Sequence, residues 1–305
     1  MLVIVCPGQG SQTPGFLEPW LELPAFAKAI DEASEAASID LRAHGTTSDA
    51  DTIRDTSVAQ PLIVAAGIAT HQSLLASGLA TLQGVAGHSV GEVTAAAISG
   101  ILSPEDAMRF VARRGNEMAK AASLSETSMA AVLGGESEDV AAYLRTLDLT
   151  PANYNGGGQI VAAGSRSAID ALRENPLEGT KVIPLQVAGA FHTRFMEPAV
   201  SALNDFSASL APADPKVEIW SNSNGQVVKS GSDFLASLVS QVASPVRWDL
   251  CMAQMIEAGV TAIIEVAPAG TLVGLAKRSM PGVELFALKS PDQMDAALEL
   301  AKSHS

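Results

Sequence analysis

The chain has 305 residues, of which 47% are hydrophobic and 17% charged, the composition of an ordinary globular protein rather than a disordered one. Its formal net charge of −14 argues against nucleic acid or an anionic membrane as a partner, because long-range repulsion slows such encounters. The two cysteines, Cys6 and Cys251, lie far apart in apolar surroundings, so we expect reduced core residues and neither a disulfide nor a catalytic thiol.

Strands and helices alternate along the first part of the chain, which predicts a mainly parallel sheet covered by helices on both faces. Pro7-Gly8 ends the first apolar run far short of a signal sequence or membrane span, so we expect a cytoplasmic protein. Ser103 is the predicted cap of the helix that Pro104 opens. The elements expected here are a strand at 2–6, a polar helix from residue 25, an apolar helix over 61–80, a strand at 82–86 and a helix over 104–122.

The pattern changes near residue 125, where a compact βαββαβ-like unit is predicted. We expect a ferredoxin-like small domain over 125–189, inserted into a large α/β catalytic domain formed by 1–124 and 190–305. The small unit is read from strands at 129–133, 160–163 and 182–185 and helices at 137–147 and 166–173. Beyond it we expect helices near 197–210, 234–242, 248–258 and from 293, and strands at 217–220, 262–266 and 285–287.

The segment Gly87-His88-Ser89-Val90-Gly91 places a serine between two glycines, where the strand 82–86 becomes an Ala-rich helix. A turn this sharp is relieved of Cβ clashes by glycine on either side of the serine. The turn exposes the Ser89 hydroxyl near free backbone N–H groups and the positive end of the helix, which favours an oxyanion beside it. A capping serine at a glycine-rich helix start is the alternative. We take Ser89 as the predicted nucleophile.

A serine nucleophile needs a base, and the chain has five histidines. The side chain of His88 is expected on the face of the strand opposite the serine. His192, on a loop that follows a strand, remains after elimination and is the predicted base, with a loop histidine satisfied by backbone as the alternative. The other three are expected mid-helix, in a polar loop and in the tail: His71, His44 and His304.

A carboxylate would complete a catalytic triad, and hydrolases of the G-x-S-x-G type place it between the serine and the histidine in the chain. The candidates in that interval fall in or beside predicted helices rather than on a loop after a core strand. A dyad whose imidazole is oriented by a backbone carbonyl and a triad therefore both stay open. The candidates are Asp106, Asp139, Asp148 and Asp170.

The segment Pro7-Gly8-Gln9-Gly10-Ser11-Gln12 follows the first strand directly. Two glycines after a strand can bind phosphate, but the third glycine of a dinucleotide site is missing. A loop that offers the Gln9 backbone N–H to an oxyanion is the second interpretation, and it fits Ser89 better.

Several segments together resemble the malonyl-CoA:acyl-carrier-protein transacylases in order and spacing, over the full length of the chain. The resemblance implies an α/β-hydrolase-like large domain with a mainly parallel sheet and an inserted ferredoxin-like small domain. The stretch 153–156 also matches a family loop near the site, and we assign it no role. The matching segments are PGQGSQ at 7–12, GHSVGE at 87–92, RRG at 113–115, GAFH at 189–192 and QVASPVRW at 241–248.

By that resemblance, Ser89 is the acylated nucleophile and His192 its general base. The backbone carbonyl of Gln241 would orient the imidazole in place of a carboxylate. The backbone N–H groups of Gln9 and Val90 would form the oxyanion hole.

The resemblance also implies that Arg114 holds the free carboxylate of a malonyl group, which its planar guanidinium matches. Left unpaired in a dry pocket beside an uncharged acyl group, it would cost about 2–5 kcal/mol, enough to reject acetyl-CoA. Arg114 follows the apolar helical face of Met108 and Val111 and precedes Gly115, which would let another backbone approach. Phe191 resembles the residue of malonyl-selective members and would crowd an α-methyl group.

The sequence thus predicts an acyltransferase that moves malonyl from malonyl-CoA to the phosphopantetheine thiol of an acyl carrier protein, through a malonyl-serine intermediate. We expect fatty acid or polyketide synthesis as the setting, no metal or cofactor, and a monomer. A serine thioesterase is disfavoured because more than a hundred residues follow His192. A silent carrier-protein-binding module is disfavoured by the intact set of Ser89, His192, Arg114 and Gln241.

Acyl carrier proteins are typically acidic, so docking on a chain of charge −14 requires a local positive patch. Arg194 lies two residues after His192, and Lys277-Arg278 end an apolar helix. We expect these cations to line the mouth through which the pantetheine arm enters, with solvated surface charges as the alternative.

Overall fold

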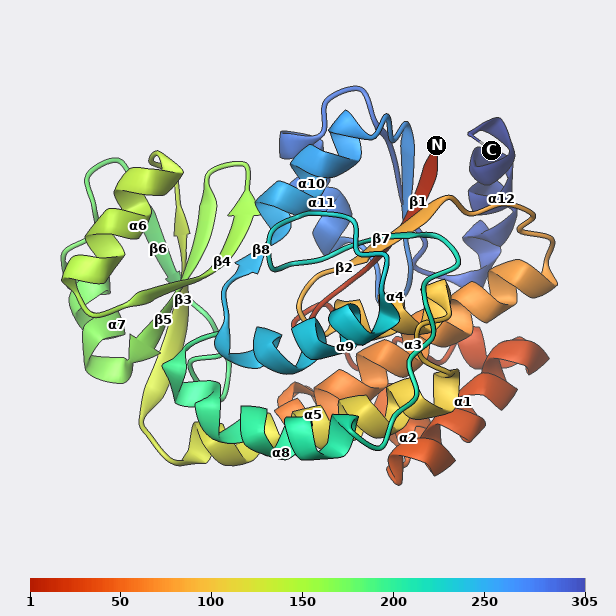
Figure 1. Cartoon of the computed structure of the whole chain (residues 1–305), viewed down its shortest axis with the longest axis horizontal. Helices are drawn as coiled ribbons and strands as arrows, with labels where there is room; N and C mark the ends of the chain where they lie inside the picture. The colour runs from red at the N-terminus through yellow and green to blue at the C-terminus, as the bar shows by residue number, and fades with distance from the viewer. Residues whose placement is uncertain (305) are drawn as a thin grey trace.

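Two five-stranded β-sheets organise the chain, each with helices packed against it (Figure 1). The computed structural model describes residues 1–304. The central sheet is parallel throughout, in the order β10-β9-β1-β2-β7. Its strands are β1 Leu2–Cys6, β2 Gly84–Gly87, β7 Glu218–Trp220, β9 Ala262–Glu265 and β10 Glu284–Ala287.

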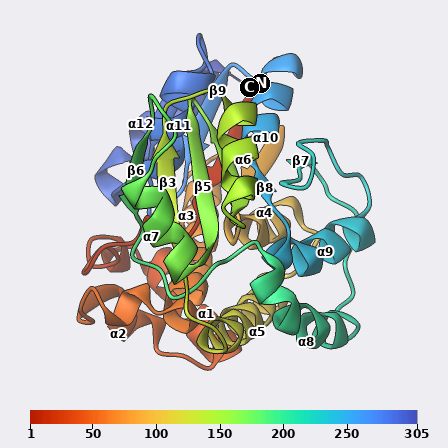
Figure 2. The same cartoon turned by 90° about the vertical axis from the view of Figure 1, so that its left-hand side faces the viewer.

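The second sheet has the order β6-β3-β5-β4-β8 and lies at the left of Figure 1, turned toward the viewer in Figure 2. Its strands are β3 Thr127–Leu133, β4 Thr150–Gly156, β5 Gln159–Ser165, β6 Lys181–Pro184 and β8 Val246–Arg247. The helices are α1 Pro24–Ala37, α2 Leu41–Thr46, α3 Thr56–Ala76, α4 Gly91–Ser99, α5 Pro104–Ser123, α6 Ser137–Thr146, α7 Arg166–Glu174, α8 Glu197–Ser207, α9 Gly231–Ser240, α10 Trp248–Glu257, α11 Thr271–Ser279 and α12 Met294–Ser303. Short 3-10 turns are η1 Trp20–Glu22, η2 Thr52–Arg54, η3 Arg194–Met196, η4 Gln241–Ala243 and η5 Pro291–Gln293.

The central strand β1 is buried on both faces, because successive side chains of a strand point in opposite directions. Leu2 and Ile4 belong to the core that includes residues of α1, α3 and α5. Val3 and Val5 belong to a second core with residues of α10 and α11. The predicted parallel sheet with helices on both faces is confirmed.

The apolar helix α3 is long and apolar enough to cross a membrane by length and composition, but 78% of that stretch is buried inside the protein. It therefore forms part of the core. It begins five residues earlier than expected, because Asp55 caps it by accepting a hydrogen bond from the Ser57 N–H at 2.8 Å. The helix continues through Pro61.

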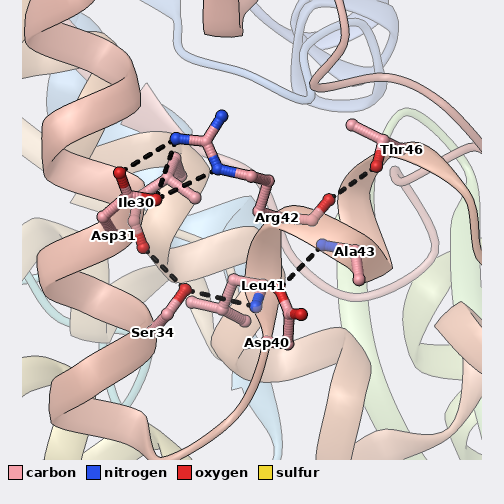
Figure 3. Close-up of polar contacts among 8 residues, drawn as sticks. All are labelled: Ile30, Asp31, Ser34, Asp40, Leu41, Arg42, Ala43 and Thr46. Carbon is pink, nitrogen blue, oxygen red and sulfur yellow. Dashed lines mark hydrogen bonds and ion pairs between the residues drawn. The ribbon is translucent and has the colours of Figure 1, made fainter.

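A polar joint fixes α2 against α1 (Figure 3). The Arg42 guanidinium donates to both oxygens of Asp31, each at 2.9 Å. Ser34 accepts a hydrogen bond from the Leu41 N–H at 3.2 Å, and Asp40 caps α2. These contacts orient α2 so that its first residue, Leu41, is buried in the core.

The second sheet is built by the order β3-α6-β4-β5-α7-β6, the βαββαβ arrangement that was predicted. Residues 153–156, expected as a loop, lie in β4, where pairing with β5 and β8 overrides the turn-forming Asn and Gly residues. The strand β8 comes from beyond residue 190 and pairs in parallel with β4, Asn153 opposite Val246. The division at residues 124 and 190 stays a prediction, and β8 joins the later segment to this sheet.

Candidate active site

The serine lies at a strained turn between β2 and α4, called here the elbow, which spans Gly87 to Gly91. Ser89 has φ +52°, in the left-handed region that favours glycine. A Cβ on Gly87 would lie 2.0 Å from the Gly91 carbonyl carbon, and a Cβ on Gly91 would lie 2.1 Å from the Cys6 carbonyl oxygen. Both glycines are therefore required, and the predicted sharp turn is confirmed.

A distant asparagine holds this turn. The Ser89 backbone N–H donates to Asn222 Oδ1 at 2.8 Å, and Asn222 Nδ2 donates to the Gly87 carbonyl at 2.7 Å. Asn222 is fully buried and follows β7, the strand beside β2. Sequence reasoning missed it, because a single asparagine 133 residues away carries no local signal.

His192 meets Ser89 directly. Its Nε2 lies 2.7 Å from the Ser89 Oγ, and its Nδ1 lies 2.8 Å from the backbone carbonyl of Gln241, the first residue of η4. A carbonyl only accepts, so Nδ1 carries the proton and Nε2 is free to accept the serine hydroxyl. The structure brings the three predicted catalytic residues together.

The partner of His192 Nδ1 is thus a backbone carbonyl, the arrangement of the dyad alternative, and no carboxylate within residues 1–304 is hydrogen-bonded to this imidazole. Burial lowers the pKa of His192 to about 3, and the charge of Arg114 acts in the same direction. The imidazole is therefore neutral near pH 7, the form that can take a proton from serine. The candidate aspartates lie elsewhere: Asp106, Asp148 and Asp170 pair with Arg109, Arg194 and Arg173, and Asp139 is exposed.

Arg114 lies on α5 and is fully buried. Its Nη1 donates to Gln60 Oε1 and its Nη2 to Gln241 Oε1, both at 2.7 Å. Its Nε has no partner among the described residues. Burial lowers the pKa of Arg114 to about 10 and the Glu92 charge opposes this, so the guanidinium stays charged near pH 7. We expected the guanidinium to lack a partner when no substrate carboxylate is bound. That expectation is corrected, because the side-chain amide oxygens of Gln60 and Gln241 accept its hydrogen bonds in the free enzyme.

The close approach expected at Gly115 is present. A Cβ there would lie 2.9 Å from the Thr56 carbonyl oxygen at the start of α3. The glycine therefore lets α5 pack against α3, which carries Gln60, and this places Arg114 within reach of that amide.

Two backbone N–H groups are expected to form the oxyanion hole. That of Val90 is next to Ser89 in the sequence, and Gln9 lines the same cavity as Ser89. The backbone N–H groups of Gln9 and Val90 have no hydrogen-bond partner within residues 1–304. Val90 precedes the first residue of α4. Both N–H groups are thus available to donate to a substrate oxygen.

A cavity of about 410 Å³ reaches this site, lined by strands β3, β4 and β5 of the second sheet, the loop after β1 and helix α11. Its wall includes Ser89, His192, Phe191 and Gln60. Arg114 is behind this wall, with its Nη1 on Gln60. Among the described residues, no group of three or more His, Cys, Asp or Glu side chains is arranged to hold a metal ion.

Comparison with known proteins agrees with this geometry. The sequence model described as "Acyl transferase domain" matches residues 3–290. The malonyl CoA-acyl carrier protein transacylase of Mycobacterium tuberculosis H37Rv is 49% identical over 98% of this chain and 100% of its own length. The chain belongs to the malonyl CoA-acyl carrier protein transacylase family. A family member from Bacillus subtilis is 31% identical over 100% of this chain and 98% of its own length.

Solved structures of transacylases share the fold. The crystal structure of the M. tuberculosis enzyme matches with a TM-score of 0.95 at 49% identity, covering 98% of this chain and 99% of that one. A malonyl-transacylase in complex with the holo acyl-carrier protein of a type II polyketide synthase matches with a TM-score of 0.92 at 27% identity, covering 98% and 99%. The α/β fold with a parallel sheet and a second sheet is that of the transacylase family.

His88 does not leave the site as expected. In this transacylase fold the left-handed turn at Ser89 leaves the His88 side chain on the wall of the same cavity. Its Nε2 lies 2.8 Å from Asn155 Oδ1, and burial lowers the pKa of His88. Asn155 on β4 therefore belongs to the site; the sequence placed the stretch 153–156 near the site but assigned it no role. His44, expected in a loop, lies in α2 with its Nδ1 3.0 Å from Ser48 Oγ.

The predicted docking cations are not all alike. Arg278 on α11 lines the cavity and donates to Gln159 Oε1 at 3.2 Å. Lys277 is exposed beside it. Arg194 forms a two-point ion pair with Asp148 at 3.1 and 2.8 Å, which offsets its charge. Of these three cations, Arg278 alone lines the cavity.

Proposed function

We propose that this chain transfers malonyl from malonyl-CoA to the phosphopantetheine thiol of an acyl carrier protein, in two steps through a malonyl-serine intermediate, for fatty acid or polyketide synthesis. The observation that carries the proposal is the contact of Ser89 Oγ with His192 Nε2 at 2.7 Å in a family whose members are named for this transfer. The cytoplasm as its location and a monomeric state are part of the same proposal.

In the first step, His192 Nε2 takes the hydroxyl proton while Ser89 Oγ attacks the thioester carbonyl. The negative oxygen that forms is stabilised by the N–H groups of Gln9 and Val90. The carbon–sulfur bond then breaks, and the leaving CoA sulfur takes the proton from His192. The products are CoA-SH and a malonyl ester on Ser89.

In the second step, the thiol of the carrier protein gives its proton to His192 and attacks the ester. The carbon–oxygen bond breaks, and Ser89 recovers its proton from the imidazole. Gln241 keeps Nδ1 as the donor in both steps, so Nε2 alternates between base and acid.

Arg114 is proposed to bind the malonyl carboxylate. Because Gln60 lines the cavity and Gln241 does not, the carboxylate would reach the guanidinium from the Gln60 side. Exchange of a neutral amide for a carboxylate strengthens the hydrogen bond to the buried charge. Phe191, 6% exposed on the cavity wall, is proposed to crowd an α-methyl group.

Carrier-protein docking is proposed at Lys277 and Arg278, with Arg194 as a weaker contributor because of its pairing with Asp148. The position of Arg278 on the cavity wall supports this, since the pantetheine arm must pass there to reach Ser89.

Mass spectrometry of the intact protein after mixing with malonyl-CoA tests the function. A malonyl adduct that persists alone and is discharged by holo acyl carrier protein supports the transferase. Rapid release of free malonate would identify a thioesterase instead, and the absence of any adduct would identify a silent binding module.

A further inference from the structure

Glu92 is a buried carboxylic acid residue in the first turn of α4. It directly follows Gly91 and is 1% exposed. Its Oε1 accepts a hydrogen bond from the Asn222 backbone N–H at 2.6 Å. Its Oε2 accepts one from Gln241 Nε2. Burying a carboxylate costs free energy unless it is hydrogen-bonded, so both contacts help to offset the cost of burying Glu92.

Each of these two neighbours reaches the reacting residues. Asn222 Oδ1 accepts from the Ser89 N–H at 2.8 Å. Gln241 Nε2 also donates to the Ser89 carbonyl at 3.0 Å, while the Gln241 backbone carbonyl holds His192 at 2.8 Å. Glu92 is therefore joined to the serine side through Asn222 and to the histidine side through Gln241.

The Gln241 side chain also separates two buried charges. Its Nε2 faces Glu92, and its Oε1 accepts from Arg114 Nη2 at 2.7 Å. An amide can meet an anion and a cation in this way in one orientation only. Burial raises the pKa of Glu92 to about 8, although the N–H donors and the Arg114 charge lower it. Because each carboxyl oxygen accepts from an N–H donor, neither is placed to carry a proton, and this geometry favours the ionised form.

We propose that Glu92 is a positioning residue for acyl transfer: its carboxylate fixes Gln241 and Asn222, and thereby the alignment of the Ser89 hydroxyl with the His192 imidazole. The inference rests on the proposed role of Ser89. Glu92 touches neither substrate nor the reacting atoms, because Gln241 and Asn222 lie between.

Glu92→Gln tests the inference with little change in volume. The new amide presents a donor where Gln241 or Asn222 also donates, so one of the two contacts must break. We expect the maximal single-turnover rate of Ser89 acylation to fall about 10–100-fold, because misplacement of about 1 Å has effects of this size. The fall is expected with both malonyl-CoA and acetyl-CoA, while the half-saturating concentration changes less than about threefold.

Glu265→Gln is the matched control. Glu265 is also fully buried, and it accepts from the N–H groups of Leu272 and Val273, both at 2.9 Å, without contacting Gln241. This variant should lower the melting temperature but keep the maximal acylation rate within about threefold of the unaltered chain. The comparison separates positioning from a general loss of stability.

Gln241→Met provides a second variant, because it removes the side-chain amide and keeps both the backbone carbonyl and Glu92. We expect a similar fall with both acyl donors. The double variant should be no slower than the slower single variant, because both changes break one contact. If Glu92→Gln does not fold, Gln241→Met decides alone.

Several outcomes would overturn the inference. One is a folded Glu92→Gln variant with the acylation rate of the Glu265→Gln control. A second is a loss of rate with malonyl-CoA only, which would mean that Glu92 acts through Arg114 alone. The others are effects that multiply in the double variant and an unaltered acylation rate in Gln241→Met. Failure of the proposed function is distinct, since the unaltered chain would then form no malonyl adduct or release free malonate, or Ser89→Ala would still carry an adduct.

Discussion

Replacing Arg114 with Ala tests how the site selects its acyl group. The change removes a fully buried cation and leaves the side-chain oxygens of Gln60 and Gln241 without their donors. It also removes the positive charge that opposes the raised pKa of Glu92. The malonyl carboxylate would then enter a buried site that holds no cation.

Loss of one partner of a buried charged pair costs about 3–5 kcal/mol, which corresponds to about 10²–10⁴-fold in kcat/KM for malonyl-CoA. Acetyl-CoA carries no carboxylate. Because the guanidinium is already paired with two amides in the free enzyme, acetyl transfer neither gains nor loses a large charge interaction, and we expect it to change less than about tenfold. The malonyl-to-acetyl ratio should therefore fall at least about tenfold.

The assay measures Ser89 acylation by each acyl-CoA in separate and in mixed reactions, read by intact-protein mass. Arg113→Ala is the matched control, because Arg113 precedes Arg114 on α5 but is 46% exposed and pairs with Glu117 at 3.3 Å. That control should keep the ratio of the unaltered chain. An unchanged ratio in Arg114→Ala, or an equal shift in Arg113→Ala, would refute the assignment of the carboxylate to Arg114.

Four further predictions follow from the site. Ser89→Ala should form no malonyl adduct and keep its melting temperature, since within residues 1–304 the hydroxyl hydrogen-bonds to His192 Nε2 alone; a persisting adduct on this variant would move the nucleophile elsewhere. His192→Ala should slow acylation about 10²–10⁴-fold in single-turnover assays, and a nearly normal rate would identify another base. Because the pKa of His192 is lowered to about 3, its neutral form persists on acidification, and the kcat/KM profile should show no loss with a midpoint near 6.5, the value of an unperturbed histidine; such a limb would contradict a buried base. Charge reversal at Lys277 and Arg278 should slow the discharge to carrier protein, more so at low salt, and spare acylation by malonyl-CoA; equal loss in both half-reactions, or in neither, would reject docking there.

The elbow and the parallel sheet could be predicted because their causes are local. Glycine at 87 and 91 is dictated by contacts under 3 Å that any Cβ would make, so the pattern itself marks the turn. The alternation of Leu2 to Cys6 over two cores likewise follows from strand geometry. His192, which elimination among few histidines selected, lies against Ser89, and its role as the base stays a prediction.

The rest of the site depends on tertiary contacts that carry no sequence pattern. Any residue could supply the backbone carbonyl that Gln241 offers to His192, so residue type does not reveal it. Asn222 and Asn155 become site residues only when β7 and β4 arrive beside the elbow. His88 was misplaced because alternation was extended one residue too far, into a turn where φ is positive at the next position.

Both reacting residues, Ser89 and His192, occupy left-handed backbone conformations, with φ +52° and +61°. Side chains are disfavoured there by about 1 kcal/mol relative to glycine. At Ser89, where the side chain contributes little packing, glycine would relieve that strain and abolish the chemistry in a single change. A descendant of this chain released from acyl transfer could therefore become inert while its fold grew more robust. The hydroxyl at the elbow is thus kept at a cost in backbone free energy that the fold itself does not require.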